Sequence, residues 1–255
     1  MDDMVDRKMQ DNPVVLVTGG AKRLGAAFCR GFFKAGWRVV IHAKDSVAEA
    51  EALARELGGE GKARILLSDL RTTEADAFVK AAYDCFGRLD AVINNASSYF
   101  RRNLLEMSET ELLEDFQINF QVPFGIMRAF ARMGHPGGIL NVLDGRISKQ
   151  DAECPGYLLA KKALAEATEM CALAWGKLGI RVNGLAPGLI RPKDGVPLKV
   201  MEPLLVRTPL GIRAKEEQLV AAALCLIEND CMTGAILPVD GGMHLAECNL
   251  GEKKP

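Results

Sequence analysis

The sequence lacks the features that would link it to a membrane, a disulfide framework or a metal cluster. Its 255 residues include seven cysteines, an odd number with no CxxC pair, and only three histidines. Scattered cysteines of this kind argue against disulfides and zinc sites. The longest apolar stretch, residues 219–227, is far shorter than the roughly 18 residues of a membrane span, and the polar N-terminus holds no secretory core. We therefore expect a cytoplasmic protein that binds no metal.

An excess of one charge is also missing. The chain has 33 acidic and 32 basic side chains, a net charge of −1 with histidine neutral. This balance disfavours a nucleic-acid partner held by bulk charge. The composition, 49% hydrophobic and 25% charged, is ordinary for a soluble globular protein. Tyrosine is scarce, so only Tyr83, Tyr99 and Tyr157 are available as phenolic groups.

Short β-branched runs alternate with longer helical patterns, with no linker, charge block or repeat between them. The strand-like runs are residues 14–17, 38–41, 63–67, 91–93, 138–143, 180–183 and 235–239. The helical patterns are residues 24–35, 47–57, 73–86, 109–133, 157–177 and 215–228. This alternation predicts right-handed βαβ units. We expect an α/β fold, a doubly wound parallel seven-stranded sheet in one Rossmann-type domain over residues 13–245, with flexible tails at 1–12 and 246–255.

A glycine-rich turn follows the first predicted strand. It reads Thr18-Gly19-Gly20-Ala21-Lys22-Arg23-Leu24-Gly25 and leads into a helix. Such a turn can be only a tight βα connection, but at the first strand of an alternating pattern it favours a dinucleotide, whose pyrophosphate binds at the helix N-terminus. The expected cofactor contacts are Gly19, Lys22, Arg23, Leu24 and Gly25. The two cations are either a solvated pair or partners of an additional phosphate.

The residues after the second strand bear on the choice between NAD and NADP. A NAD site usually places an acidic residue there to bind the ribose 2′-hydroxyl. Here the chain reads His42-Ala43-Lys44-Asp45-Ser46. Lys44 can donate to a 2′-phosphate, and Ser46 offers a hydroxyl and suits a helix N-cap. His42, Lys44 and Ser46 are therefore predicted to bind NADP, with Asp45 meeting a ribose hydroxyl as the alternative.

Tyr157 and Lys161 stand four residues apart in a helical pattern, so both project from one face. A nearby ammonium lowers the pKa of a phenol. Such a pair can deliver a proton while a cofactor delivers a hydride. Alone, this spacing is usually a chance surface pair; the glycine turn and the strand pattern favour the catalytic interpretation.

Several motifs stand in a fixed order along the chain. They are the turn Thr18 to Gly25, Asp69-Leu70, Asn94-Asn95-Ala96, Asn119, Tyr157 with Lys161, Pro187-Gly188 and Asp240-Gly241-Gly242. In this order they resemble the short-chain dehydrogenase/reductase family over nearly the whole chain.

The resemblance implies a role for each matching residue. Tyr157 would be the proton donor, Lys161 would bind the nicotinamide ribose and lower the pKa of Tyr157, and Asn119 would hold a water of the proton relay. The implied cofactor contacts are Asp69, Leu70, Asn95, Ala96, Pro187 and Gly188. Members of the family commonly form homotetramers through two long helices, here residues 109–133 and 157–177.

One position departs from the family pattern. The usual catalytic serine lies 13 residues before the tyrosine, where this chain has Asp144. A carboxylate there would repel an oxyanion, as in an enzyme that has lost catalysis. Alternatively, Asp144 hydrogen-bonds Tyr157 and helps to protonate a ring nitrogen.

Two further features favour the second alternative. Arg23 replaces a glycine of the turn, and Asn95-Ala96-Ser97-Ser98-Tyr99 ends in an aromatic ring. With Asp144, these features resemble the pteridine reductase branch of the family, including the bacterial dihydrofolate and dihydromonapterin reductases. The resemblance implies that Ser97 bonds the pterin edge, Tyr99 stacks on the ring, and Arg23 reaches phosphate and substrate; an aromatic lid is the alternative for Tyr99.

The sequence therefore predicts an NADPH-dependent reductase acting on a C=N bond of a pterin, dihydropterin or dihydrofolate, with Tyr157 and Asp144 supplying the proton. The expected partner is a small pterin-like molecule, and neither nucleic acid nor membrane is expected. A ketone reductase of the same family is the alternative enzyme. An NADP-binding sensor without catalysis is the alternative from another class.

Overall fold

The structure is a computed structural model that describes residues 12–192, 195–206 and 208–246. The two predicted tails, residues 1–12 and 246–255, lie outside the described residues except for Asn12 and Ala246. Within those ranges, no helix combines the length and apolar character needed to cross a bilayer. The same part of the chain brings no three His, Cys, Asp or Glu side chains together as metal ligands.

The described residues form a parallel seven-stranded sheet in the order β3-β2-β1-β4-β5-β6-β7. The strands are β1 Val14–Val17, β2 Arg38–Ala43, β3 Ala63–Leu67, β4 Ala91–Asn94, β5 Gly137–Val142, β6 Ile180–Pro187 and β7 Ile236–Val239. This confirms the predicted fold class. Strand order changes direction between β1 and β4, and ligands of such sheets bind at the carboxyl ends of the strands near this point.

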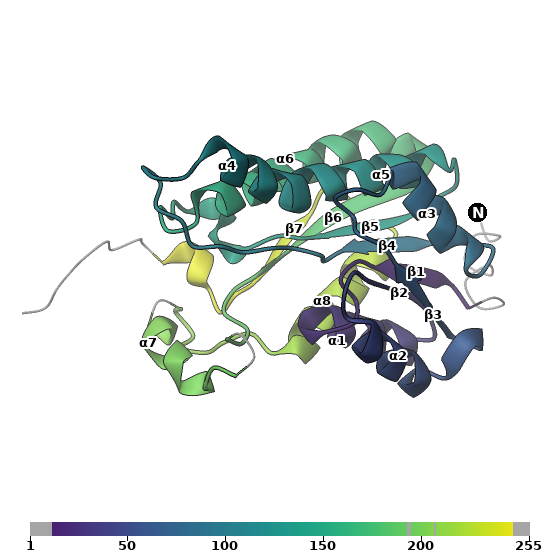
Figure 1. Ribbon diagram of the computed structural model, residues 1–255, viewed down its shortest axis with the longest axis horizontal. Helices are drawn as coiled ribbons and strands as arrows, with labels where there is room; N and C mark the ends of the chain where they lie inside the picture. The colour runs from purple at the N-terminus through teal and green to yellow at the C-terminus, as the bar shows by residue number, and fades with distance from the viewer. Residues whose placement is uncertain (1–11, 193–194, 207, 247–255) are drawn as a thin grey trace, which may run out of the picture.

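Helices cover both faces of the sheet in a three-layer arrangement (Figure 1). They are α1 Arg23–Lys34, α2 Val47–Glu56, α3 Ala75–Asp84, α4 Glu109–Phe116, α5 Val122–Arg132, α6 Pro155–Trp175, α7 Glu202–Leu205 and α8 Glu216–Glu228. In the view of Figure 1, helices α3 to α6 lie above the sheet and α1, α2 and α8 below it. The short helix α7 lies between β6 and α8 along the chain.

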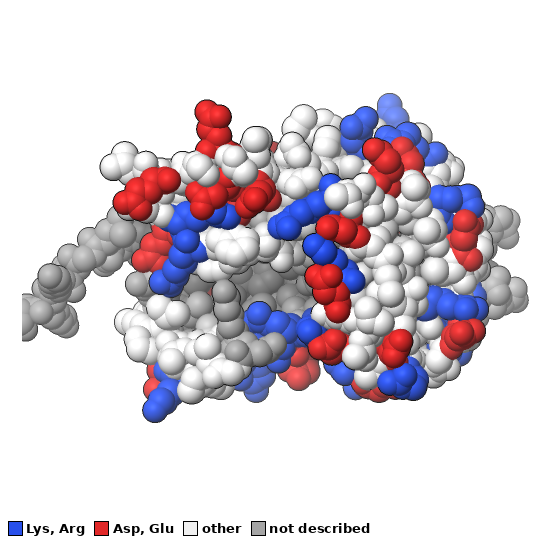
Figure 2. All heavy atoms as spheres, viewed as in Figure 1, with Lys and Arg blue, Asp and Glu red and all other residues white. Residues whose placement is uncertain are grey.

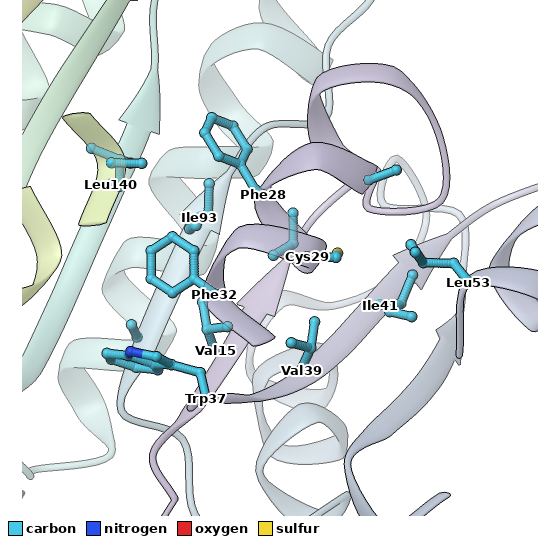
Figure 3. Close-up of a cluster of buried hydrophobic side chains, with 14 of the residues drawn as sticks. Val15, Phe28, Cys29, Phe32, Trp37, Val39, Ile41, Leu53, Ile93 and Leu140 are labelled. Carbon is cyan, nitrogen blue, oxygen red and sulfur yellow. The ribbon is translucent and has the colours of Figure 1, made fainter. Parts of the chain in front are cut away.

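Two hydrophobic clusters hold the layers together, one on each face of the sheet. Successive side chains of a strand point to opposite faces. Accordingly Val15 and Val17 of β1 join the cluster with α1, whereas Val14 and Leu16 join the cluster with α3 and α5. Figure 3 shows part of the first cluster, in which the labelled aromatic side chains are Phe28, Phe32 and Trp37. All four residues of β1 are fully buried, which explains why the strand reads as a continuous apolar run.

The helix predicted over residues 109–133 is present as a continuous helical stretch over residues 109–132, but it is not a regular α-helix throughout. The structure has α4, then a π-helical turn over Gln117–Gln121, then α5. The side-chain amide of Asn119 donates to the carbonyl of Asp115, which an α-helix would offer to the backbone N–H of Asn119. Pro123 has no N–H for the Asn119 carbonyl. Both features weaken the regular pattern at Asn119, and π-turns of this kind are frequent at functional sites.

Strand β6 is longer than predicted. It continues past Asn183 to Pro187, and the additional residues pair with β7 from Gly184 opposite Ile236 to Pro187 opposite Val239. Gly184 and Pro187 argue against a strand interior on propensity alone, which is why the prediction ended early. The extension carries Pro187 and Gly188 to the edge where β1, β4 and β5 end.

Candidate active site

The glycine turn after β1 brings the backbone of Gly19 and the backbone of Gly25 into close contact. Gly19 has φ of +61°, a conformation that glycine adopts freely. A Cβ on Gly25 would lie 2.1 Å from the carbonyl oxygen of Gly19, so only glycine fits there. Helix α1 begins beside the turn with neither a side-chain cap nor an acidic residue in its first turn. Its N-terminal N–H groups are thus available to an anion.

Residues after β4 hold this turn in place. The Thr18 hydroxyl accepts hydrogen bonds of 2.9 Å from the backbone N–H groups of Asn95 and Ala96. In return, the Asn95 amide donates to the carbonyls of Thr18 at 2.9 Å and Gly19 at 3.2 Å. The predicted cofactor residues of two separate motifs therefore meet at the switch point.

His42 supports the turn from below. Its Nδ1 accepts a hydrogen bond of 3.0 Å from the backbone N–H of Gly19, and its Nε2 lies 3.1 Å from the carbonyl of Ser68. These partners require the tautomer protonated on Nε2. Burial lowers the pKa of His42, with the Ser68 carbonyl and Asp69 opposing the shift, so the ring is neutral. Both ring nitrogens are therefore used within the protein, and the contact of His42 with the cofactor stays a prediction that does not use them.

Three other residues that are predicted to bind the cofactor have partners within the protein or lie in its core. Lys44 lies 2.9 Å from the Asp69 carboxylate, and this hydrogen bond lowers the pKa of Asp69. Lys22 lies 2.7 Å from Glu49 in the first turn of α2. Leu70 is buried in the core. Figure 2 shows the same interspersion of basic and acidic side chains over the whole visible face.

Ser46 occupies the predicted N-cap of α2, but its side chain makes no capping hydrogen bond. The expectation that its hydroxyl caps the helix is therefore wrong. That hydroxyl stays available to a ligand beside Lys44.

Arg23 stands at the first position of α1 with φ of +51°, the only non-glycine residue with positive φ in the described ranges. Such a conformation is uncommon outside glycine, and strain of this kind often marks functional sites. The Arg23 guanidinium donates to the carbonyls of Arg191 and Pro192 at 3.4 and 3.2 Å. It thereby connects the glycine turn with the segment after β6 across the mouth of the site.

Gly188 closes this edge of the site. Its backbone N–H donates to Val239 at the end of β7. A Cβ on Gly188 would lie 2.6 Å from the Cα of Asp240, so the close approach of the two segments requires glycine. Pro187, the last residue of β6, is thus held at the carboxyl end of the sheet as predicted.

Tyr157 and Asp144 meet, as one of the two alternatives for Asp144 expects. Tyr157 lies in the first turn of α6, and its hydroxyl donates a hydrogen bond of 2.9 Å to Oδ2 of Asp144. Burial and the neighbouring Asp144 carboxylate raise the pKa of Tyr157 well above its usual value, and they outweigh the charge of Arg146, which lowers it. The net shift in the protein without cofactor is therefore opposite to the lowered pKa expected beside Lys161.

Lys161 is almost completely buried behind Tyr157. Its ammonium donates a hydrogen bond of 2.7 Å to the carbonyl of Val142 and lies 5.9 Å from the centre of the Tyr157 ring. Burial lowers the pKa of Lys161 to about 8, with Asp144 opposing the shift. Tyr157 and Lys161 thus lie on one face of α6, as predicted, and both side chains are buried.

Asn119 connects the π-helical turn with the loop after β4. The fully buried side chain donates to the carbonyls of Ser98 and Asp115, each at 3.0 Å, and accepts a hydrogen bond of 2.6 Å from the hydroxyl of Ser97. Ser97, predicted to bind the pterin edge, thus has a partner within the protein. Asn119 fixes the loop that leads to Tyr99.

Tyr99 lies against Tyr157. Their rings pack edge to face with centroids 5.1 Å apart and planes at 89°. Arginine contributes to the same cluster, since the guanidinium carbon of Arg146 lies 5.4 Å from the centre of the Tyr99 ring. Tyr99 therefore lies beside Tyr157, the predicted proton donor, where a stacking platform would have to be.

Arg146 is the residue of this site that the sequence reasoning missed. Its guanidinium donates two hydrogen bonds of 2.9 Å to the Asp144 carboxylate, one from Nε to Oδ1 and one from Nη2 to Oδ2. The sequence signal that could have indicated this contact is the short segment Asp144-Gly145-Arg146, in which an arginine follows an aspartate by two residues. That spacing alone does not predict a contact. Only the 3₁₀ turn over Gly145–Ser148 brings the guanidinium back over the carboxylate. Burial alone would raise the pKa of Asp144, but the hydrogen bonds and charge of Arg146 outweigh it and hold that pKa below its usual value.

Comparison with known proteins agrees with this geometry. The family model described as short chain dehydrogenase matches residues 13–198. The chain is 32% identical to pteridine reductase 1 of Leishmania tarentolae, covering 91% of this chain and 96% of that protein. It is 29% identical to the L-tagatose-forming galactitol 2-dehydrogenase of Cereibacter sphaeroides, covering 91% and 95%.

Solved structures give the same result. The chain is similar to alternative dihydrofolate reductase 1 (FolM) of Brucella suis, solved in complex with NADP. The TM-score is 0.86, the sequence identity is 29%, and the match covers 93% of this chain and 96% of the other. The fold is therefore shared with a structure described as a reductase in complex with NADP.

Proposed function

The chain belongs to the short-chain dehydrogenase family, and from this membership we propose that it reduces a C=N bond of a pterin or dihydropterin with NADPH. It is an NADP-dependent oxidoreductase related to pteridine reductases. The observation that carries the pterin assignment is the hydrogen bond of 2.9 Å from Tyr157 to Asp144.

A carboxylate suits a pterin better than a ketone. A ketone develops negative charge on oxygen during reduction, and the Asp144 carboxylate would oppose that charge. A ring nitrogen of a pterin is more basic than a carbonyl oxygen, so it can take a proton from Tyr157 while the Asp144 carboxylate keeps its hydrogen bond to the tyrosine. Asp144 at this position therefore favours a nitrogen heterocycle over a carbonyl substrate.

The residues of the glycine turn fit a dinucleotide. The cradle at Gly19 and Gly25 excludes side chains, and the uncapped start of α1 presents N–H groups to the pyrophosphate. When bound, NADPH supplies the hydride. The remaining proposed contacts are Lys22, Arg23, Leu24, Asp69, Leu70, Asn95, Ala96, Pro187 and Gly188.

For the 2′-phosphate we propose Lys44 and Ser46. The Lys44 ammonium is already positioned by Asp69, and the Ser46 hydroxyl is not used by the helix cap. A lysine donates to phosphate as a mobile point charge. Binding of the phosphate would replace the carboxylate partner of Lys44.

Tyr99 and Ser97 are the proposed substrate contacts. The Tyr99 ring stands beside the Tyr157 ring, and a flat heteroaromatic gains from offset stacking on such a ring. Ser97 reaches the same space while bonded to Asn119, whose proposed relay water would lie on this side. Arg23, whose guanidinium donates to the carbonyls of Arg191 and Pro192, is the third proposed substrate contact.

In this site Tyr157 holds the proton and Lys161 stabilises the oxygen that loses it. The raised pKa of Tyr157 keeps the hydroxyl protonated at neutral pH, so Tyr157 carries the proton that it is proposed to donate. The buried Lys161 ammonium next to its ring offsets the negative charge left after transfer.

The two long helices support a homotetramer. Leu113 of α4 and Leu159, Met170 and Leu173 of α6 are all exposed large apolar side chains. Side chains of this kind in one layer are typical of an oligomer interface. Sedimentation at micromolar concentration should give four times the mass of one chain, and a monomer would contradict the proposal.

The test of the reaction compares substrates. NADPH oxidation is measured with a dihydropterin, with dihydrofolate and with a panel of ketones under the same conditions. We expect turnover of the pterin compounds. Ketone turnover without any pterin turnover would identify a carbonyl reductase instead. NADPH binding without turnover of any compound would identify a sensor.

A further inference from the structure

The carboxylate of Asp144 is surrounded by hydrogen-bond donors. Its Oδ1 accepts from the backbone N–H of Arg146 at 2.8 Å and from Nε at 2.9 Å. Its Oδ2 accepts from Nη2 of Arg146 and from the Tyr157 hydroxyl, both at 2.9 Å. Two carboxylate oxygens have about four lone-pair positions, so every position is filled.

Three of these four donors come from Arg146, two of them from its guanidinium. A cation in bidentate contact favours the ionised form of a carboxyl group. A protonated Asp144 would have to donate to the Tyr157 oxygen while facing this cation as a neutral acid. The geometry thus assigns the one proton shared by Asp144 and Tyr157 to the tyrosine.

Arg146 is itself held in place by the loop that follows it. Its Nη1 donates to Oδ2 of Asp151 at 2.8 Å and to the sulfur of Cys154 at 3.3 Å. The Arg146 side chain is only 26% exposed and that of Asp144 only 15%. A pair with this geometry and burial is far more rigid than a surface salt bridge.

We propose that Arg146 is a positioning residue that holds Asp144 as an ionised acceptor, so that Tyr157 alone gives its proton to the substrate nitrogen. The proposal takes its substrate from the proposed pterin reduction, but its test does not depend on turnover. In the reaction the carbon of the C=N bond accepts a hydride, with NADPH as the reductant. The π electrons of that bond pass to nitrogen, and the nitrogen takes the Tyr157 proton. A phenolate remains and is reprotonated from water.

Several other groups lie next to Asp144, Tyr157 or Arg146 or act on their titration. They are Asp151 and Cys154 from the loop after β5, Lys161 from α6 and Tyr99 from the loop after β4. On the side of β7, the Cβ of Asp240 lies near Gly145. Asp240 and His244 bond each other at 2.9 Å. Arg146 is the only one of these groups whose guanidinium contacts both oxygens of Asp144 among the described residues.

The experiment is a carbon-13 NMR titration of the aspartate carboxyl groups in the full chain without cofactor. The signal of Asp144 is identified by its loss in Asp144→Asn. Over the pH range in which circular dichroism shows a folded protein, wild-type Asp144 should not titrate above pH about 4, the usual value for aspartate. In Arg146→Met the midpoint should rise by about 1 to 3 pH units, because burial then acts without the cation.

Three further variants separate the proposed role from a structural one. Arg146→Lys keeps the positive charge but cannot make the bidentate contact, so the midpoint of the Asp144 titration should rise less than in Arg146→Met. The lysine variant also replaces Arg146→Met in the test if the methionine variant does not fold. Asp151→Asn removes the charge of the second carboxylate that Arg146 contacts, and Lys162→Gln removes a cation of α6 that donates to Gln150. Both should leave Asp144 untitrated above pH about 4.

The proposal is overturned by either of two results. One is a wild-type Asp144 that titrates at or above the usual value. The other is an Arg146→Met variant, or the lysine variant in its place, whose Asp144 midpoint equals that of wild type. Neither result bears on pterin turnover, so failure of the proposed reaction is recognised separately by the substrate comparison.

Discussion

The hydroxyl of Tyr157 donates to Oδ2 of Asp144, although the two residues come from different elements, the start of α6 and the end of β5. Asp144 follows β5 after one intervening residue, Leu143, and the 3₁₀ turn that Asp144 caps returns the chain toward α6. The contact therefore depends on the packing of the helix against the strand end, and it defines where a substrate must lie.

Replacing Tyr157 by Phe should abolish reduction while leaving NADPH binding intact. The ring and its contact with Tyr99 remain, but the proton is lost. General acids typically contribute 10² to 10⁴-fold, so kcat should fall by about this factor. Asp144→Asn should lose less, because an amide oxygen still accepts from the tyrosine. Equal losses in the two variants, or full activity in Tyr157→Phe, would contradict the assigned proton donor.

Replacing Lys44 by Ala should weaken the preference for NADPH over NADH. Loss of one charge-assisted contact to the 2′-phosphate costs about 1.5 to 3 kcal/mol, so the ratio of kcat/KM for the two cofactors should fall at least tenfold. Lys34→Ala, a change at the far end of α1, is the matched control and should keep the wild-type ratio. An unchanged ratio in Lys44→Ala would remove Lys44 from the phosphate site.

Reduction should weaken as pH rises through about 8 in the free enzyme. The pKa of Lys161 is lowered to about 8 by burial, so the ammonium beside Tyr157 is present below this pH and lost above it. The alkaline limb of kcat/KM for NADPH oxidation measures the change. Lys161→Met should remove the limb and lower activity at pH 7. A limb that persists in Lys161→Met would assign it to another group.

Much of the fold could be predicted from the sequence because buried parallel strands are apolar on consecutive residues. Strands β1 and β3 agree residue for residue with the predictions. The break in the helix at Asn119 could not be predicted, because it depends on a side chain that competes with its own backbone for the Asp115 carbonyl. Helical periodicity continues through such a turn without a signal.

The candidate site was predictable in its motifs and not in its contacts. Tyr157 and Lys161 could be placed on one helix face by their spacing of four residues, whereas Asp144 could be placed beside them only through the resemblance to the family, whose serine stands at that position. Arg146 could not be placed, since an arginine two residues from an aspartate contacts it only when the intervening backbone turns back. The support that His42 gives to the Gly19 N–H could not be predicted either, because sequence does not tell which groups a buried ring contacts.

The stability of the protein should depend on the neutral state of His42. Burial lowers its pKa below the usual value of about 6.5, so the unfolded chain binds more protons than the folded one below that pH. The stabilisation is therefore present above pH 6.5 and is lost as pH falls toward the folded pKa. Each unit of pKa shift contributes about 1.4 kcal/mol.

Thermal unfolding of His42→Asn measures this contribution. The asparagine oxygen can still accept from Gly19 but does not titrate, so the fall in Tm between pH 7.5 and 5.5 should be smaller than in wild type. His135→Asn should show the wild-type fall. The same pH dependence in wild type and His42→Asn would mean that His42 is not the group responsible.

Gly25→Ala should damage both folding and cofactor binding through one contact. The new Cβ would lie 2.1 Å from the Gly19 carbonyl oxygen and 2.8 Å from the Asn95 amide nitrogen, distances that real Cβ atoms do not show. Either the glycine turn or the start of α1 must move, and overpacking of this kind costs about 1 to 3 kcal/mol. Both segments belong to the region that is proposed to hold the pyrophosphate.

For Gly25→Ala, a lower Tm and weaker NADPH binding, measured by nicotinamide fluorescence, are expected together. Gly176→Ala is the control, since its Cβ would meet no atom within 4 Å. If Gly25→Ala bound NADPH as tightly as this control, the glycine turn would not be the phosphate cradle.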